Sequence, residues 1–248
     1  MSHAGRNAPT VASVGDDTGA SATDKVTSDT TLTITGTAEP GATIKVYDNT
    51  DPNNPVLVGT GVADAQGNYS VVTTPLQPDA TYPLSVTQTD LGGNTSAPVS
   101  AGNWTIDTTP PASPAITSYS QDTGTTGDGV TSDTDLSLSG TAEPGASVAV
   151  YDNGTLIGTV VANAQGNWTL NTTGTLADGA HSFTTTATDT AGNTSQPSAP
   201  LVITVDTLPP AQPTLVSVSQ DTGPSATDKV TSDTTLTLTG RAEAGSTV

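Results

Sequence analysis

The chain has 248 residues, of which 24 are Asp or Glu and only 5 are Lys or Arg, so its net charge is −19. This excess of negative charge excludes a nucleic-acid backbone and an anionic lipid surface as partners and favours cations instead. Cysteine is absent, which excludes disulfides and thiol chemistry.

The start of the chain, Met1-Ser-His-Ala-Gly5, lacks the apolar stretch of a secretory signal. No apolar run approaches the roughly 18 residues that a membrane span needs, so we expect no direct membrane contact. These features predict a cloning remnant or linker over residues 1–8, ahead of an internal fragment of a longer secreted chain.

A repeat is visible along the rest of the chain. The string Val-Thr-Ser-Asp occurs at residues 26–29, 130–133 and 230–233. Asp-Thr-Gly precedes each copy, and Gly-Thr-Ala-Glu-Pro-Gly follows the first two copies. The chain therefore contains two complete repeats and one incomplete repeat.

Pairs of adjacent prolines mark the boundaries, at Asp107-Thr-Thr-Pro-Pro and Asp206-Thr-Leu-Pro-Pro. Two adjacent prolines favour extended backbone and stiffen a link. We expect repeat 1 at residues 9–109, repeat 2 at 110–209 and an incomplete repeat 3 at 210–248 that stops after its third strand.

Apolar residues alternate with Thr and Ser inside each repeat, which is the period of a half-buried strand. The low content of large apolar residues alone would suggest disorder, but a disordered segment has no reason to keep this alternation. In repeat 2 the expected strands are Ala115–Ser120, Asp135–Ser139, Ser147–Asp152, Thr155–Ala162, Asn167–Asn171, His181–Thr188 and Leu201–Asp206. Seven short strands in about a hundred residues predict an all-β fold, namely tandem seven-stranded immunoglobulin-like β-sandwiches arranged end to end.

The repeated motifs also resemble a known family. Asp-Thr-Gly, Val-Thr-Ser-Asp, Gly-Thr-Ala-Glu-Pro-Gly and Thr-Asp-Thr-Ala-Gly-Asn (188–193) together are similar to the bacterial immunoglobulin-like repeats of giant calcium-binding adhesins, of the RTX type secreted by the type 1 route, and of biofilm-associated proteins. The resemblance implies an extracellular location on a bacterial surface. It also implies an extender arm that positions a distal adhesive tip for cell adhesion or biofilm formation, with calcium stiffening the joints between neighbouring repeats. Repeat 1 departs mildly, with Leu91-Gly-Gly where repeat 2 has Thr190-Ala-Gly.

Chain direction sorts the acidic residues within each sandwich. If the chain enters at one end and leaves at the other, the first, third, fifth and seventh strands all point toward the C-terminal end, and the loops that follow them gather there. For repeat 1 that end would hold Asp17, Asp24, Asp29, Asp48 and Asp107, and for repeat 2 Asp122, Asp128, Asp133, Asp152 and Asp206. The N-terminal end of repeat 2 would bring Glu143 and Asp189 to the first joint.

Carboxylates brought together in this way repel one another, and Ca²⁺ accepts six to eight oxygen ligands from such flexible sets. We therefore expect calcium at the joints, and the sequence has no EF-hand spacing that would place it elsewhere. The alternative is that these residues are turn formers and solubilising surface. The expected ligands are Asp24, Asp29, Asp107, Glu143 and Asp189 at the first joint and Asp128, Asp133 and Asp206 at the second, with Asp17, Asp48, Asp122 and Asp152 as further candidates.

Catalysis has little support, because there is no nucleophile elbow, phosphate loop or His-rich metal spacing. His181 opens an expected strand, and Trp104 and Trp168 lie in alternating strands and are expected in the cores. The alternative to an extender is a ligand-binding module that contacts a glycan or host protein through its end loops, including the longer turn over residues 50–55 of repeat 1.

Overall fold

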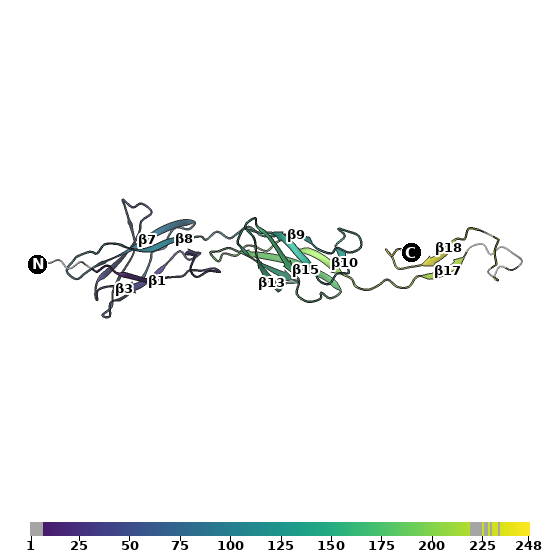
Figure 1. The fold of residues 1–248 in the computed structure, drawn as a ribbon, viewed down its shortest axis with the longest axis horizontal. Coiled ribbons are helices and arrows are strands. Elements are labelled where there is room, and N and C mark those ends of the chain that lie inside the picture. The colour runs from purple at the N-terminus through teal and green to yellow at the C-terminus, as the bar shows by residue number, and fades with distance from the viewer. Residues whose placement is uncertain (1–6, 219–224, 226–227, 229, 233) are drawn as a thin grey trace.

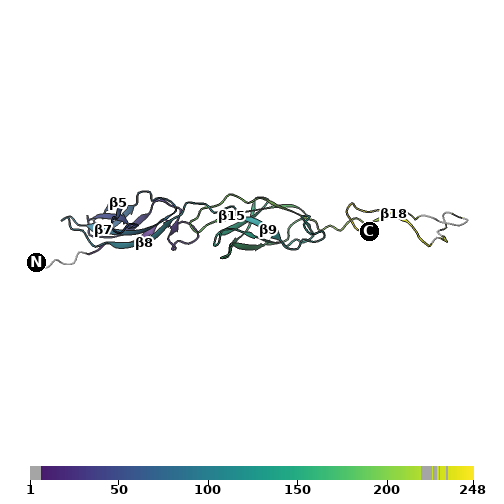
Figure 2. The ribbon, with the colours of Figure 1, turned by 90° about the horizontal axis from the view of Figure 1, so that it is seen from above.

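The computed structural model describes residues 7–218, 225, 228, 230–232 and 234–248, and its secondary structure within these ranges consists of strands. Two sandwiches and a two-stranded hairpin follow one another along the long axis (Figure 1), and the view from above shows the same linear order (Figure 2). Within the described ranges, the chain contains no helix that could span a membrane. Most of the expected remnant at residues 1–8, and Asp233 of the third Val-Thr-Ser-Asp copy, lie outside the described residues.

Repeat 1 is a sandwich of a three-stranded and a five-stranded sheet. The smaller sheet has the order β1 (Thr10–Gly15), β3 (Thr33–Thr37), β6 (Asn68–Val72). The larger sheet has the order β2 (Val26–Thr27), β8 (Val99–Ile106), β7 (Ala80–Thr89), β4 (Thr43–Asp48), β5 (Val56–Val62).

Repeat 2 has the same architecture, which explains the sequence repeat. Its three-stranded sheet has the order β14 (Asn167–Asn171), β11 (Ser137–Thr141), β9 (Ala115–Tyr119). Its five-stranded sheet has the order β10 (Val130–Thr131), β16 (Leu201–Val205), β15 (Gly179–Thr188), β12 (Ser147–Asp152), β13 (Thr155–Val161). The tandem immunoglobulin-like sandwiches expected from the sequence are confirmed.

All seven strands expected in repeat 2 are present, and β12 and β14 have the expected bounds. One strand in each repeat, β2 or β10, was not predicted from the sequence. Each has only two residues, which is too short to show an alternation of apolar and polar residues. Both lie in the Val-Thr-Ser-Asp motif and pair parallel with the last strand of their sandwich. At this motif the chain crosses from the smaller sheet to the larger one, at the C-terminal end of the sandwich.

Alternate residues of the two sheets face each other and form the cores, as expected for a sandwich. In repeat 2, Leu138, Val148, Val150 and Phe183 are fully buried and Trp168 nearly so. The first glycine of the Gly-Thr-Ala-Glu-Pro-Gly motif is required by this packing. A Cβ on Gly140 would overlap the Ala115 carbonyl oxygen and would meet the Trp168 ring at 2.5 Å.

In the described part of repeat 3 the strands are β17 (Thr214–Val218) and β18 (Leu238–Arg241), which pair antiparallel. Leu215, Val216 and Leu238 on this hairpin are each more than 60% exposed. Residues 246–248, where the third expected strand would begin, are not in a strand. In repeat 2 the equivalent strand β12 pairs on both sides, with β13 and β15, and the described part of repeat 3 has neither partner.

Candidate functional site

The joint between repeats 1 and 2 brings together segments far apart in the sequence. From repeat 1 come the loop after β1 and the residues after β8, and from repeat 2 comes the turn between β15 and β16. Asp107 donates its backbone N–H to the Thr27 carbonyl, which ties the end of β8 to β2 at this end of the sandwich. The sorting by chain direction is therefore correct for these loops.

Two hydrogen bonds cross the joint. The Thr18 hydroxyl donates to the carbonyl oxygen of Ala191 at 2.6 Å. The side-chain amide of Asn193 donates to the carbonyl oxygen of Asp107 at 2.8 Å. The same amide group also donates to Asp189 Oδ2 at 2.9 Å, so Asn193 connects the acidic turn of repeat 2 to the last residues of repeat 1.

Two glycines allow the backbones to approach closely at this joint. Gly19 has φ of 100°, and a Cβ there would overlap the carbonyl oxygen of Thr190. A Cβ on Gly192 would lie 3.0 Å from the amide nitrogen of Gly19. Ala191 is consequently fully buried, whereas its equivalent in repeat 1, Gly92, is exposed.

Asp107 of repeat 1 and Asp189 of repeat 2 both act on Glu143 of repeat 2 at the joint. Burial raises the pKa of Glu143, and the nearby carboxylates of Asp189 and Asp107 raise this pKa further. Asp189 is only 5% exposed and accepts hydrogen bonds from the backbone N–H and the side-chain amide of Asn193. Within the described residues no hydrogen-bond donor to the Glu143 carboxylate is found, and the two like charges of Asp189 and Asp107 lie near it.

Two further acidic side chains, Asp17 and Asp24, lie close together in the loop after β1. Burial raises the pKa of Asp17, the Lys25 backbone N–H opposes this by donating to Asp17 Oδ2 at 3.2 Å, and the neighbouring Asp24 raises the pKa again. Asp17 Oδ1 is buried without a hydrogen-bond partner in the described structure. An unpaired buried carboxylate oxygen is costly, and a bound cation is one way to satisfy it.

Most other predicted ligands use one carboxylate oxygen to form a local turn, which agrees with the alternative interpretation that they are turn formers. Asp29 Oδ1, for example, accepts from the backbone N–H and the hydroxyl of Thr31, and Asp48 Oδ1 does the same with Thr50. One oxygen each of Asp122, Asp133 and Asp152 is buried and unpaired in the described structure. The remaining turn formers are Asp24, Asp107, Asp128, Asp133 and Asp206, each accepting from a backbone N–H two residues further on.

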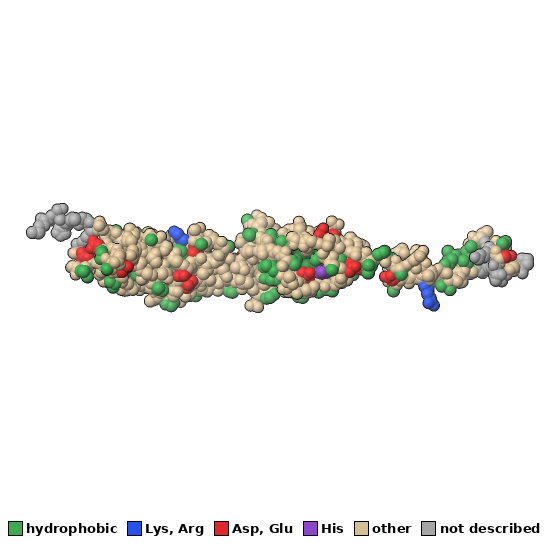
Figure 3. Space-filling model, turned by 90° about the horizontal axis from the view of Figure 1, so that it is seen from below, with side chains coloured by type: hydrophobic (Ala, Val, Ile, Leu, Met, Phe, Trp, Pro, Cys, Tyr) green, Lys and Arg blue, Asp and Glu red, His purple; other side chains and the backbone are tan. Residues whose placement is uncertain are grey.

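Within the described ranges, no group of three or more His, Cys, Asp or Glu side chains is close enough to hold a metal ion. Acidic side chains also lie in small separate groups on the face drawn in Figure 3, and basic side chains are rare there. The structure thus brings Asp107, Glu143 and Asp189 within electrostatic reach of one another without gathering them into a compact carboxylate cage. Calcium binding stays a prediction.

Two aspartates that were not predicted as functional residues hold the linkers. Asp79 Oδ1 accepts from the Thr108 backbone N–H at 3.1 Å, and its Oδ2 accepts from the Thr109 hydroxyl at 3.0 Å. Asp178 Oδ1 accepts from the backbone N–H and the hydroxyl of Thr207 at the equivalent place. Asp79 and Asp178 directly precede the equivalent strands β7 and β15, and this recurrence in the two repeats was the available signal.

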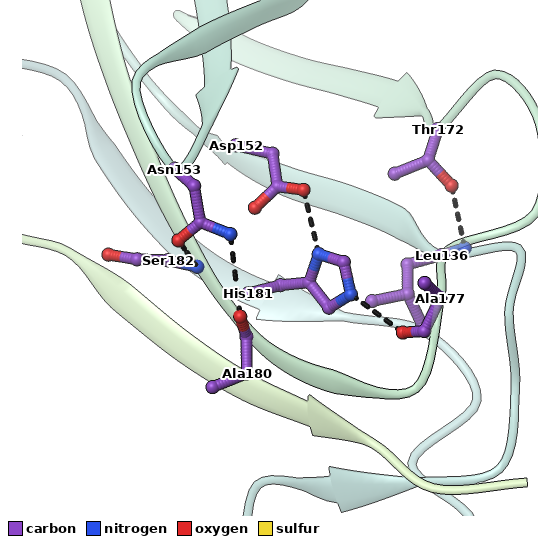
Figure 4. Close-up of polar contacts among 8 residues, drawn as sticks. All are labelled: Leu136, Asp152, Asn153, Thr172, Ala177, Ala180, His181 and Ser182. Carbon is purple, nitrogen blue, oxygen red and sulfur yellow. Dashed lines mark hydrogen bonds and ion pairs between the residues drawn. The ribbon is translucent and has the colours of Figure 1, made fainter.

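His181 forms a polar site at the C-terminal end of repeat 2 (Figure 4). Its Nδ1 lies 2.7 Å from Asp152 Oδ2 and its Nε2 lies 2.9 Å from the Ala177 carbonyl oxygen. Both partners are acceptors, so the doubly protonated ring satisfies both. Burial lowers the pKa of His181, but the Ala177 carbonyl and Asp152 outweigh it and the pKa is raised overall. The ion pair also occupies one oxygen of Asp152, a further candidate for metal binding.

Comparison with protein families agrees with the two sandwiches. Residues 110–207 match the family described as Bacterial Ig-like domain, and residues 20–103 match the family described as Bacterial Ig domain. The two repeats are bacterial immunoglobulin-like domains. The match in repeat 1 begins after β1, and the match in repeat 2 spans every strand of its bacterial immunoglobulin-like domain. No curated protein matches the chain.

Several solved structures are similar in fold. Fibronectin(III)-like modules of Clostridium thermocellum CbhA share 15% identity, with 73% of this chain and 87% of that chain covered and a TM-score of 0.45. A tetra-tandem repeat in the extending region of a large adhesion protein shares 23% identity, covering 86% and 51%, with a TM-score of 0.33. The BSP domain of a biofilm-associated protein shares 22%, covering 81% and 30%, with a TM-score of 0.29. The chain thus spans about half of the adhesion-protein structure and about a third of the biofilm-associated protein structure.

Proposed function

We propose that these domains belong to the extender region of a bacterial surface adhesin. In this role the repeats supply length, and they position a distal adhesive tip outside the cell for adhesion or biofilm formation. The observation that supports the proposal best is the direct contact between two domains of the same architecture in linear order (Figure 1), with linker residues held by Asp79. Domains repeated in this way add length and nearest-neighbour contacts.

We further propose that calcium stiffens the first joint. Asp107, Glu143 and Asp189 would hold the ion there, together with Asp17 or Asp24 from the loop after β1. Bound calcium supplies positive charge that neutralises these carboxylates. Two properties of the joint fit this ligand: its donors are carboxylate and carbonyl oxygens, which calcium prefers, and Glu143 faces like charges that raise its pKa.

The test compares two variants of the full chain by small-angle scattering, in calcium and in chelator. In calcium, the Asp107→Ala variant should be as flexible as the wild type is in chelator. Asp206→Ala is the matched control, because Asp206 makes the same backbone contact, to Leu208 instead of Thr109, beside a hairpin that lacks a turn equivalent to residues 189–193. The calcium proposal fails if calcium leaves the wild-type scattering profile unchanged, and the extender proposal fails if the chain is compact in both conditions.

A further inference from the structure

The loop after β9 in repeat 2 is built like the joint-forming loop after β1 in repeat 1. The Thr123 hydroxyl oxygen accepts from the Ser132 backbone N–H at 2.7 Å, as Thr18 does from Ser28 at 2.8 Å. The buried hydroxyl of Thr131 donates to the Gln121 carbonyl oxygen at 2.6 Å, and Thr27 makes the equivalent bond to Asp16.

The backbone of the two loops is also the same. Asp16 and Gln121 have φ of 75° and 65°, and the glycines three residues later, Gly19 and Gly124, have φ of 100° and 80°. Positive φ at a residue other than glycine is uncommon, so its recurrence shows that each loop is held in one shape. Repeat 2 therefore presents Thr123 and Gly124 in the geometry that Thr18 and Gly19 use at the first joint.

The two loops differ in what covers them. Gly19 packs against Thr190 and Gly192 of the next domain. A Cβ placed on Gly124 would have no heavy atom of the described chain within 4 Å, apart from the two residues next to Gly124 in the sequence. The Thr18 hydroxyl reaches the Ala191 carbonyl, and no carbonyl acceptor for Thr123 is found in the described ranges. The second loop is preorganised and uncovered.

We infer that Thr123 and Gly124 form a docking surface for the β15–β16 type turn of another immunoglobulin-like domain, with the sequence Asp-x-Ala-Gly-Asn. Such a turn offers a carbonyl acceptor to the Thr123 hydroxyl and a glycine that permits close approach to Gly124. The occupant is identified by the first joint, where the turn at residues 189–193 meets the equivalent loop.

This inference rests on the extender role only in requiring domains to follow one another, and it does not depend on calcium. The joint contacts at Thr18 and Gly19 involve a hydroxyl, a carbonyl and glycine backbone, none of which needs a cation. Docking should consequently persist in chelator. A measurement in chelator can therefore refute the docking surface without bearing on the calcium proposal.

The test uses the full chain extended so that repeat 3 contains all the strands of a sandwich. Residues 149–207 of repeat 2 are added after Val248, which is equivalent to Val148, so the third domain gains its missing strands and the turn at 189–193. Backbone amide signals of Thr123 and Gly124 are compared by NMR with those of the 248-residue chain, in calcium and in chelator. Relaxation measurements report whether repeats 2 and 3 tumble as one body.

We expect the two amide signals to shift and the two domains to tumble together. Gly124→Ala should abolish both effects, and Gly19→Ala, which imposes the same backbone strain, should leave them intact while releasing repeats 1 and 2 from each other. Unchanged Thr123 and Gly124 signals beside a folded third domain, or undisturbed docking in Gly124→Ala, would overturn the inference. If the added domain does not fold, Gly19→Ala in the 248-residue chain decides: an unaltered first joint would refute the docking geometry.

Discussion

The hydroxyl of Thr18 in repeat 1 donates to the carbonyl oxygen of Ala191 in repeat 2 across 2.6 Å. This contact and the amide of Asn193 join two domains whose cores are separate. The relative orientation of the domains therefore depends on a small number of polar contacts, which point variants can test one at a time.

Thr18→Val keeps the shape of the side chain and removes the hydrogen bond to Ala191. A net loss of about 1 kcal/mol should open the joint roughly fivefold more often, with both domains folded. Thr123→Val is the matched control, since each variant also loses the acceptor for one backbone N–H, Ser28 or Ser132. Relaxation measurements should show freer motion between repeats only for Thr18→Val, and equal motion in the two variants would refute a role for this contact.

Asp79→Asn should release the start of the first linker. Asparagine tolerates the positive φ of 59° at this position, so the backbone is spared, but the charge-assisted bonds to Thr108 and Thr109 weaken. Amide exchange at Thr108 should become several-fold faster. In Asp178→Asn the change should appear at Thr207 instead, and unaltered exchange at Thr108 in Asp79→Asn would count against the linker role.

His181 should make the stability of repeat 2 depend on pH. Its pKa is raised above the ordinary 6.5 in the folded domain, so the proton binds more tightly to the folded than to the unfolded chain. The stabilisation is fully present below the unfolded pKa, declines as the pH rises toward the folded pKa, and is lost above it. Asp152 is the charged group that faces the ring.

The control for this pH dependence comes from repeat 1, where Tyr82 occupies the equivalent position and donates to the Gln77 carbonyl at 2.9 Å. In the wild type, repeat 2 should become less stable as the pH rises above the ordinary pKa of histidine. In His181→Tyr this decrease should be absent. Thermal unfolding at a series of pH values measures both. A wild-type unfolding curve for repeat 2 that does not change across this range would contradict the assignment.

Glu143→Gln should have opposite effects with and without calcium. In chelator the substitution removes a carboxylate that faces Asp189 and Asp107, so the joint should become tighter; in calcium it removes a proposed ligand, so the joint should loosen. In wild type without calcium, the joint should weaken as the pH rises through the raised pKa of Glu143. Glu39→Gln, at the equivalent position of repeat 1, is the control. The same sign of effect in both conditions would argue that Glu143 is not a ligand.

Strand positions could be predicted from the sequence because burial on one face imposes a period of two, which β12 and β14 follow closely. The gathering of Asp107 and Asp189 at one joint could also be predicted, because chain direction decides which loops share an end. Two-residue strands such as β10 could not, since they have no period. The bond between Thr18 and Ala191 could not either, because it depends on how one domain is rotated against the next. The pairing of His181 with Asp152 follows from the register of β12 with β15, which alternation alone does not set.

Calorimetric titration of calcium into the full chain tests the proposed calcium-stiffened joint most directly. The wild-type chain should bind calcium with a dissociation constant of roughly 10⁻⁴ to 10⁻³ M, typical of extracellular modules, and this binding should be lost in Asp107→Ala but not in Glu39→Gln. No measurable binding to the wild-type chain, together with a melting temperature that is the same in calcium and in chelator, would contradict it.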